Sequence, residues 1–369
     1  MHAVILAGGS GTRLRPLTYA RRKELVPLLN RPLLEYRLRN LRDHGVTHIV
    51  VACAQGAGEI EEHFGDGASL GVRLTYNYEQ KPLGSGRAVK EAARAAGATG
   101  TLAVCNGDIL TNLDLTAMIA QHRETGATLS MSLAPVDDPW QFGVVAVDDE
   151  LRISTFVEKP PQGEQPSNLI NAGTWLWEPV MLDRIPDDDA AIVDGFSERV
   201  LFPWIIADGM RAQGFVEDLW VDVGAPDRYI RAMRLLLERE SARRGRSLLV
   251  EQGAQIAAGV EFAGAVLVGE GATIDAGARI IGPSVIGERA IVSAGAVIER
   301  SVLWEDARVG EGATIRDSIV AAGASIGGGA LIDDAILANG ARVPDGMQLD
   351  PGARLMPDDT AGASAPKAG

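Results

Sequence analysis

The last third of the chain carries the feature that most constrains its fold, a regular spacing of apolar residues. They recur every six positions from 256 to 298, and from there to 343 the intervals run five, six and six. Blocks that begin at Ser284, Ser301, Ser318 and Ala335 form four consecutive 17-residue units. An α-helix has 3.6 residues per turn and cannot keep a period of six on one face. A parallel β-helix can, because each short strand is one side of a coil and the periodic residues stack inside it.

The chain before this repeat has a different pattern. Only Phe262 and Trp304, among all the aromatic residues, follow position 250. Earlier, short apolar runs alternate with amphipathic segments, which is typical of a mostly parallel sheet covered by helices on both faces. We therefore predict an α/β, Rossmann-like domain with a mostly parallel mixed sheet over 1–243, a basic linker at Arg243–Arg246, a parallel β-helix over 250–351, and a disordered tail over 352–369.

Composition excludes several classes of protein. A formal net charge of −14 argues against nucleic acid or an anionic membrane as the main partner, because both require a basic surface. No apolar stretch approaches the 18 residues of a membrane span. Cys53 and Cys105 are too few for a disulfide framework and lie in apolar runs, so we expect buried thiols. The start, Met1–Leu6, lacks the basic region of a signal peptide, and we expect a cytoplasmic protein.

A glycine-rich loop directly follows the first strand pattern and reads Gly8-Gly9-Ser10-Gly11-Thr12-Arg13. Glycines let the backbone approach a phosphate closely, and arginines such as Arg13 and Arg15 suit phosphate oxygens. A P-loop would need Lys-Ser or Lys-Thr after its last glycine, where this chain has Thr12-Arg13. A dinucleotide fingerprint would need a third glycine where this chain has Leu14. The loop therefore predicts a phosphate site of another kind.

From this loop onward the chain resembles the sugar-nucleotide pyrophosphorylases, which are sugar-1-phosphate nucleotidyltransferases. Their signature of Gly-Thr-Arg-Leu-x-Pro-Leu-Thr followed by Lys-x-Leu-x-Pro matches Gly11–Thr18 and Lys23–Pro27. Further short motifs follow in the family's order along the chain: Pro82–Gly86, Asn106–Asp108, Phe142–Val144, Glu158–Pro160, Asn171–Gly173 and Trp220–Gly224. The departures are Gly86-Arg87 in place of Ala-Gly, and Glu24 where Pro or Gln is frequent.

The resemblance implies attack by a sugar 1-phosphate on the α-phosphorus of a nucleoside triphosphate, which releases pyrophosphate. It implies these roles: Arg13 and Lys23 as catalytic cations; Leu6, Gly8, Gly9, Gly11, Thr12, Glu79, Gly84 and Ser85 in nucleotide binding; Gly143, Glu158, Lys159, Asn171 and Gly173 in sugar-phosphate binding; and Asp108 and Asp222 as ligands of Mg²⁺. Both aspartates follow apolar runs, as expected of ligands presented at strand ends.

The repeat resembles the hexapeptide-repeat, left-handed β-helix domains. Some of these are acyltransferases with a histidine base, but all five histidines of this chain precede position 123. We therefore expect a structural module that forms a homo-oligomer through the β-helix. The wording of the signature is most similar to mannose-1-phosphate guanylyltransferases. Glucose-1-phosphate thymidylyl- or uridylyltransferases, and a catalytically silent regulatory subunit that binds a sugar nucleotide, remain alternatives.

Overall fold

The structure is a computed structural model that describes residues 1–54, 56–81, 83–188 and 195–362. Pro82 of the predicted nucleotide segment and residues 363–369 of the predicted tail lie outside the described residues. The chain divides into two compact units. The first contains Met1–Ser10 and Leu33–Asp222, and the second contains Gly11–Pro32 together with the chain from Val223 onward.

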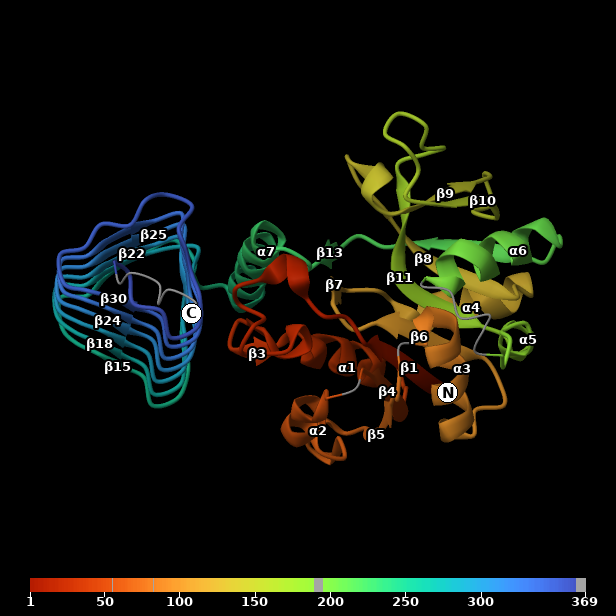
Figure 1. Cartoon of the computed structure of the whole chain (residues 1–369), viewed down its shortest axis with the longest axis horizontal. Coiled ribbons are helices and arrows are strands. Elements are labelled where there is room, and N and C mark those ends of the chain that lie inside the picture. The colour runs from red at the N-terminus through yellow and green to blue at the C-terminus, as the bar shows by residue number, and fades with distance from the viewer. Residues whose placement is uncertain (55, 82, 189–194, 363–369) are drawn as a thin grey trace, which may run out of the picture. The chain divides into compact units, whose positions relative to one another are not determined.

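The first unit is built on a nine-stranded mixed sheet (Figure 1). Its strands are β1 (His2–Ala7), β4 (His48–Cys53), β5 (Arg73–Tyr78), β6 (Leu102–Asn106), β8 (Leu129–Pro135), β9 (Gly143–Val147), β10 (Ile153–Glu158), β11 (Leu169–Trp177) and β12 (Ala212–Val216). β1 lies between β4 and β6, parallel to both, and β5 pairs in parallel with β4. β11 pairs antiparallel with β6, β8 and β9. The sheet is therefore mixed, as predicted, with parallel pairs around β1 and antiparallel pairs around β11.

Helices connect these strands. They are α1 (Leu33–Asp43), α2 (Gly58–Phe64), α3 (Gly84–Ala96), α4 (Leu115–Thr125), α5 (Pro179–Asp183) and α6 (Phe202–Ala207). α1 buries Leu34, Leu38 and Leu41, which recur at the spacing of one helical face. Cys53 and Cys105 are buried free thiols, as predicted.

The second unit contains α7 (Pro226–Arg244) and a stack of coils whose strands form three parallel sheets (Figure 1). The first sheet is β14 (Leu248–Val250), β17 (Val266–Val268), β20 (Ser284–Ile286), β23 (Val302–Leu303), β26 (Ile319–Val320), β29 (Ile336–Leu337) and β31 (Arg354–Leu355). The second is β15 (Gln255–Ile256), β18 (Thr273–Ile274), β21 (Ile291–Val292), β24 (Arg308–Val309), β27 (Ser325–Ile326) and β30 (Arg342–Val343). The third is β16 (Glu261–Ala263), β19 (Arg279–Ile281), β22 (Val297–Glu299), β25 (Thr314–Arg316) and β28 (Leu331–Asp333). This is the predicted parallel β-helix.

The interior of the coils is a column of the periodic apolar residues. From Val268 to Val343 each of them is buried in one continuous core, together with the alanines of the turns. Val266 pairs with Ser284 eighteen positions later, whereas Val302 pairs with Ile319 seventeen positions later. The 17-residue unit therefore holds for the middle coils, and the outer coils have one residue more.

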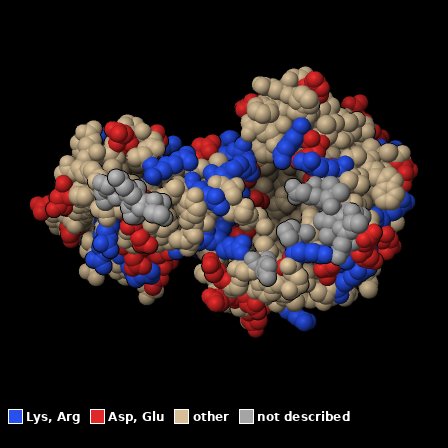
Figure 2. Space-filling model, in the orientation of Figure 1, with Lys and Arg blue, Asp and Glu red and all other residues tan. Residues whose placement is uncertain are grey.

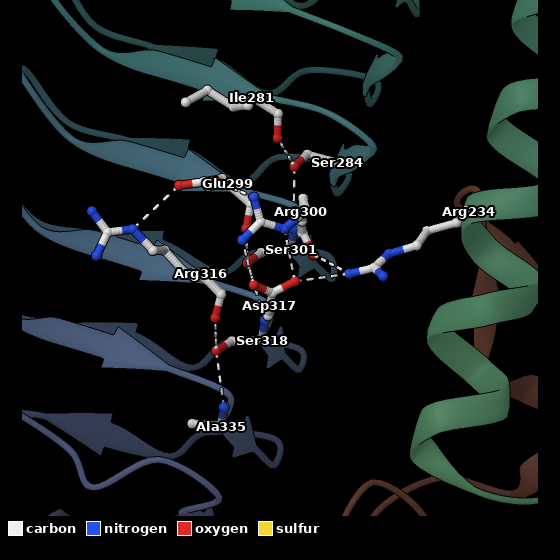
Figure 3. Close-up of polar contacts among 10 residues, drawn as sticks. All are labelled: Arg234, Ile281, Ser284, Glu299, Arg300, Ser301, Arg316, Asp317, Ser318 and Ala335. Atoms are coloured by element: carbon white, nitrogen blue, oxygen red, sulfur yellow. Dashed lines mark hydrogen bonds and ion pairs between the residues drawn. The ribbon is translucent and has the colours of Figure 1, made fainter.

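The 17-residue coils have one residue fewer than the outer coils at the corner between the third and first sheets. At this corner, buried serines bridge neighbouring coils (Figure 3). The Oγ of Ser284 accepts the backbone N–H of Ser301, and that of Ser301 accepts the N–H of Ser318, both at 3.1 Å. Each hydroxyl also donates to a carbonyl of its own coil. Arg300 precedes Ser301, and Asp317 precedes Ser318 on the next coil. These two residues form an ion pair at 2.6 Å. The corner is therefore tied by hydrogen bonds inside and an ion pair outside.

The compact units cut across the predicted domain limits of 1–243 and 250–351, because α7 and Gly11–Pro32 belong with the β-helix. The expected linker is short. Arg243 and Arg244 are the last turn of α7, where both bind Glu240, and β14 begins three residues after Gly245.

The predicted disordered tail is wrong for residues 352–362. Arg354–Leu355 form β31, which pairs with β29, and Thr360 bridges to Arg342. Leu355 packs against the β-helix core and Ala361 is buried in it, so burial of apolar surface orders this segment.

The charged residues are mixed in sign on one face of the molecule (Figure 2). On the face drawn in Figure 2, Lys and Arg side chains are interspersed with Asp and Glu. This face therefore carries charges of both signs, although the net charge of the chain is −14. None of the helices in the described part of the chain combines the length and apolar character needed to cross a membrane.

Candidate active site

The glycine loop leaves β1 where the sheet ends. Leu6 pairs with Asn106 on β6, and the carbonyl of Leu6 accepts the backbone N–H of Gly107 at 2.9 Å. Gly8 and Gly9 are exposed, and a Cβ added to either would meet no described atom within 4 Å. Local packing and backbone shape thus do not demand glycine at these two positions. Close approach by a ligand would demand it.

Gly11 is different, because its backbone conformation and its close neighbours require glycine. Its φ is +61°, and an added Cβ would lie 3.2 Å from the Cβ of Lys23 and from the Cγ2 of Thr18. The hydroxyl of Thr18 donates to the Gly11 carbonyl at 2.8 Å. Thr12 and Arg13 then form a short 3₁₀ turn in which Arg13 is exposed, whereas Lys23 is buried. The structure therefore brings the predicted Gly11 and Lys23 into contact within the second unit.

The two predicted metal ligands are carried by one two-stranded ribbon in the first unit. β7 (Ile109–Thr111) pairs antiparallel with β13 (Trp220–Asp222), and Asp222 lies opposite Ile109. Asp108, which precedes Ile109, is therefore at the same end of the ribbon as Asp222. Asp108 is half-buried and Asp222 is buried.

This pair of carboxylates fits Mg²⁺ better than a metal held by protein alone. Within the described ranges, no three His, Cys, Asp or Glu side chains gather in a way that could hold a metal ion. Mg²⁺ is commonly held by one or two carboxylates together with substrate phosphates, so two aspartates at one ribbon end supply a suitable donor set.

The predicted sugar-phosphate residues Gly143, Glu158 and Lys159 lie together. Gly143 pairs with Glu158 across β9 and β10, and the Lys159 ammonium lies 3.4 Å from the Glu158 carboxylate. A Cβ on Gly143 would lie 2.8 Å from Glu158 Oε2 and 2.6 Å from Phe156. Glycine therefore leaves the space that the Glu158 carboxylate occupies. Lys159 has a φ of 49°, and its side chain is 61% exposed.

Asn171 and Gly173 lie at a bulge of β11. Asn171 Oδ1 accepts the N–H of Gly173 at 3.1 Å and the indole N–H of Trp175 at 2.9 Å. Gly173 has a φ of +77°, and an added Cβ would lie 2.8 Å from the amide nitrogen of Asn106, at the end of β6. The bulge is thus packed against the segment that leads to Asp108.

The predicted nucleotide residues Glu79, Gly84 and Ser85 lie where β5 ends and α3 begins. Glu79 accepts the backbone N–H of Leu83 at 3.2 Å, and burial raises the pKa of its carboxyl. Gly84 opens α3 with a φ of +69°. The hydroxyl of Ser85 donates to Glu198 at 2.8 Å and accepts the N–H of Ser197 at 3.1 Å. Ser85 therefore ties the start of α3 to Ser197 and Glu198, and its role in nucleotide binding stays a prediction.

Comparison with known proteins identifies the family of this chain. Residues 2–239 match the family model described as nucleotidyl transferase. The chain belongs to the nucleotidyl transferase family. Residues 262–364 match a second model, described as the GMPPB C-terminal domain. The predicted family is thereby confirmed, and with it the predicted enzyme class.

Relatives of this nucleotidyl transferase have several substrate pairs in their names. A mannose-1-phosphate guanylyltransferase of Mycobacterium tuberculosis is 37% identical over 71% of this chain and 73% of its own length. A UTP–glucose-1-phosphate uridylyltransferase of Synechocystis is also 37% identical, over 65% of this chain and 64% of its own length. A solved structure from Bacillus anthracis, named as a candidate glucose-1-phosphate thymidylyltransferase, shares the fold with a TM-score of 0.57 and 23% identity, over 64% of this chain and 95% of that one.

Two groups around the ribbon of this nucleotidyl transferase were not identified from the sequence. Trp220, on β13, packs edge-to-face on Phe142 with ring centroids 5.2 Å apart and donates its indole N–H to the Ala172 carbonyl at 3.0 Å. It thereby links the ribbon that ends at Asp222 to the segments of Gly143 and Gly173. The sequence places Trp220 in a motif but does not indicate this contact.

The second group is a buried polar cluster. Glu217 is 4% exposed and accepts a hydrogen bond from the hydroxyl of Thr111 on β7. Burial raises the pKa of Glu217 to about 7, although the Thr111 hydroxyl and the charge of Arg37 oppose the shift. Arg37, on α1, is buried, and its nitrogens have no hydrogen-bond partner among the described residues. An acidic residue between short apolar runs carries no sequence signal of such burial.

Proposed function

We propose that this nucleotidyl transferase is a mannose-1-phosphate guanylyltransferase. It transfers the guanylyl group of GTP to mannose 1-phosphate and releases pyrophosphate. The observation that carries this choice is the pairing of two family models in one chain, the nucleotidyl transferase at 2–239 and the GMPPB C-terminal domain at 262–364. The name of the M. tuberculosis relative supports the same substrate pair.

In the proposed reaction a phosphate oxygen of the sugar 1-phosphate attacks the α-phosphorus of GTP. The new P–O bond forms as the bond from the α-phosphorus to the bridging oxygen breaks, and pyrophosphate leaves with that electron pair. Two anions must approach each other, so positioned cations and backbone donors supply most of the catalysis. Arg13 neutralises charge on the phosphates, and Lys23 does so from a buried position against Gly11.

The remaining predicted residues bind and orient the substrates. Gly8 and Gly9, together with Gly11, Leu6 and Thr12, hold the triphosphate end of the nucleotide through backbone contacts. The segment of Glu79, Gly84 and Ser85 faces the base. Lys159 binds the phosphate of the sugar, while Glu158, whose carboxylate occupies the space beside Gly143, accepts hydrogen bonds from sugar hydroxyls.

Asp108 and Asp222 would hold Mg²⁺, since they lie at one end of the β7–β13 ribbon. When bound, the ion supplies charge neutralisation at the phosphate oxygens. The proposed partners are therefore GTP, mannose 1-phosphate and Mg²⁺, with self-association through the β-helix retained as a proposal.

Pyrophosphate release tests this function. The protein is incubated with Mg²⁺ and each of ATP, CTP, GTP, UTP and dTTP, crossed with mannose, glucose and N-acetylglucosamine 1-phosphates. We expect GTP with mannose 1-phosphate to be turned over fastest. Asp108→Asn should abolish turnover, whereas Asp218→Asn, an exposed aspartate just before β13, should not.

Other outcomes point to the alternatives. Preference for UTP or dTTP with glucose 1-phosphate would replace the proposed pair with the one in the name of the Synechocystis relative or of the B. anthracis structure. If no combination of nucleotide and sugar phosphate is turned over but a sugar nucleotide still binds tightly, the protein is a regulatory subunit.

A further inference from the structure

The segment Gly11–Pro32, which carries Arg13 and Lys23, belongs to the same compact unit as the β-helix. It lies along one corner of the coils, at the end of the first sheet. Asn30 donates to the Glu251 carboxylate at 3.2 Å, and Glu251 follows β14. Arg21 forms a two-point ion pair with Glu305, which lies just beyond β23. The segment is therefore held at two separate coils.

The repeat itself marks this corner as unusual. In the register of the first sheet, the positions that follow its seven strands are Glu251, Gly269, Gly287, Trp304, Ala321, Ala338 and Met356. Four of the seven are Gly or Ala, which fits a tight corner between stacked coils. Trp304 is the largest exception, in a β-helix whose one other aromatic residue is Phe262.

Trp304 connects three parts of the unit. It is 1% exposed, and its indole N–H donates to the hydroxyl of Tyr229 on α7 at 2.9 Å. The Tyr229 hydroxyl in turn donates to the carbonyl of Pro27 at 2.7 Å. An indole can only donate, and a phenol can both accept and donate, so the order of this relay follows from the groups themselves. It runs from the β-helix through α7 to a carbonyl four residues beyond Lys23.

A face of the same indole ring also has a partner. The guanidinium of Arg21, two residues before Lys23, lies 5.2 Å from the centre of the Trp304 ring while it binds Glu305. A cation over an aromatic face, held at the same time by a carboxylate, is fixed in two directions. Lys23 therefore lies in sequence between two anchored residues. Arg21 contacts Trp304 and Glu305, and the carbonyl of Pro27 accepts the hydroxyl of Tyr229.

We propose that Trp304, with Tyr229 and Glu305, positions the segment that carries Lys23 and Arg13, so that the β-helix takes part in nucleotidyl transfer. These are positioning residues, since they act through Lys23 and Arg13 and not on the substrates. The inference rests on the proposed function for its catalytic consequence. The anchoring itself rests only on the contacts within this unit.

Kinetics of two conservative variants test the consequence. Tyr229→Phe removes the hydroxyl that serves Pro27, and Trp304→Phe removes the indole N–H but keeps a ring. Measured with the substrate pair that the unmodified protein turns over, both should lower kcat/KM for the nucleotide at least tenfold. The KM for the sugar phosphate should stay within twofold, because Lys159 belongs to the other compact unit.

A matched control separates positioning from general weakening of the β-helix. Ser301→Ala removes a buried hydrogen bond between the coil of Trp304 and the next coil, in which the Ser301 hydroxyl accepts the N–H of Ser318. It should reduce thermal stability and leave kcat/KM within twofold. Loss of turnover in Ser301→Ala equal to that in Tyr229→Phe would refute a specific positioning role, and so would unchanged kinetics in both Phe variants.

Hydrogen exchange tests the anchoring without any need for activity. In the full-length protein, peptides that cover residues 20–32 should exchange at least tenfold faster in Tyr229→Phe than in the unmodified protein, and those from the sheet strand β1 should not change. Equal exchange rates would overturn the anchoring even in an active enzyme. If the unmodified protein is silent on every substrate pair, the proposed function and the catalytic consequence fail together, while exchange still decides the anchoring.

Discussion

Glu217 makes the stability of the first unit depend on pH. Its carboxyl has a pKa of about 7 in the folded chain, mainly because burial disfavours its charged form. In the unfolded chain the same group returns to its ordinary value of 4.5. A folded pKa raised above the unfolded one contributes stability that is complete below pH 4.5 and is lost as the pH rises through 7. A shift of this size corresponds to roughly 3 kcal/mol, since one pKa unit is about 1.4 kcal/mol.

Glu217→Gln should remove this dependence, because an amide cannot ionise and its oxygen can still accept from Thr111. We expect the free energy of unfolding of the variant, relative to the unmodified protein, to rise by about 2–3 kcal/mol between pH 5 and pH 8. Urea unfolding followed by tryptophan fluorescence measures it, since five of the six tryptophans precede residue 250.

Glu178→Gln is a control of opposite sign. Burial acts to raise the pKa of Glu178, but hydrogen bonds from Thr101 and His122 outweigh it and lower the pKa below its usual value. Its contribution is therefore present above the unfolded pKa and is lost as the pH falls. Curves of unfolding free energy against pH that run parallel for Glu217→Gln and the unmodified protein would refute the assignment.

Three further substitutions test the packing of each part. Ser301→Ala should lower the free energy of unfolding of the β-helix by about 1–3 kcal/mol, because it leaves a buried N–H of the next coil without its acceptor, and calorimetry measures this. Gly11→Ala should cost about 1–2 kcal/mol from its positive φ and reduce turnover, and normal activity would contradict the role of that turn. Gly143→Ala should raise the KM for the sugar phosphate about tenfold, or about 1.4 kcal/mol, by displacing Glu158, whereas Gly100→Ala, in open space, should not.

Much of the fold can be predicted from local patterns of apolar residues and glycines along the chain. The six-residue period determines a β-helix because only a stacked coil puts every sixth residue inside, and the residues from Val268 to Val343 lie there. The helix of Leu34, Leu38 and Leu41 and the buried strands around β1 follow from equally simple periodicities. The glycines at 8, 9 and 11 indicate a phosphate loop without reference to the rest of the chain.

The boundaries of the β-helix and of the two compact units depend on contacts between distant residues. Residues 352–362 carry a weak repeat, and they are ordered because Leu355 and Ala361 find apolar partners on the preceding coils. The membership of Gly11–Pro32 in the unit of the β-helix depends on contacts between residues nearly 300 positions apart, such as Arg21 and Glu305.

The sequence by itself determined the class of fold and the family, because these depend on spacing along the chain, and it predicted the residues of the candidate site. The tertiary structure decided which of those residues meet and what supports them. The ribbon that joins Asp108 to Asp222, the burial of Glu217, and the relay from Trp304 to Pro27 all require strands and coils to pair at one register. A hydrogen bond or a pKa depends on what lies across that register, which composition and spacing do not specify.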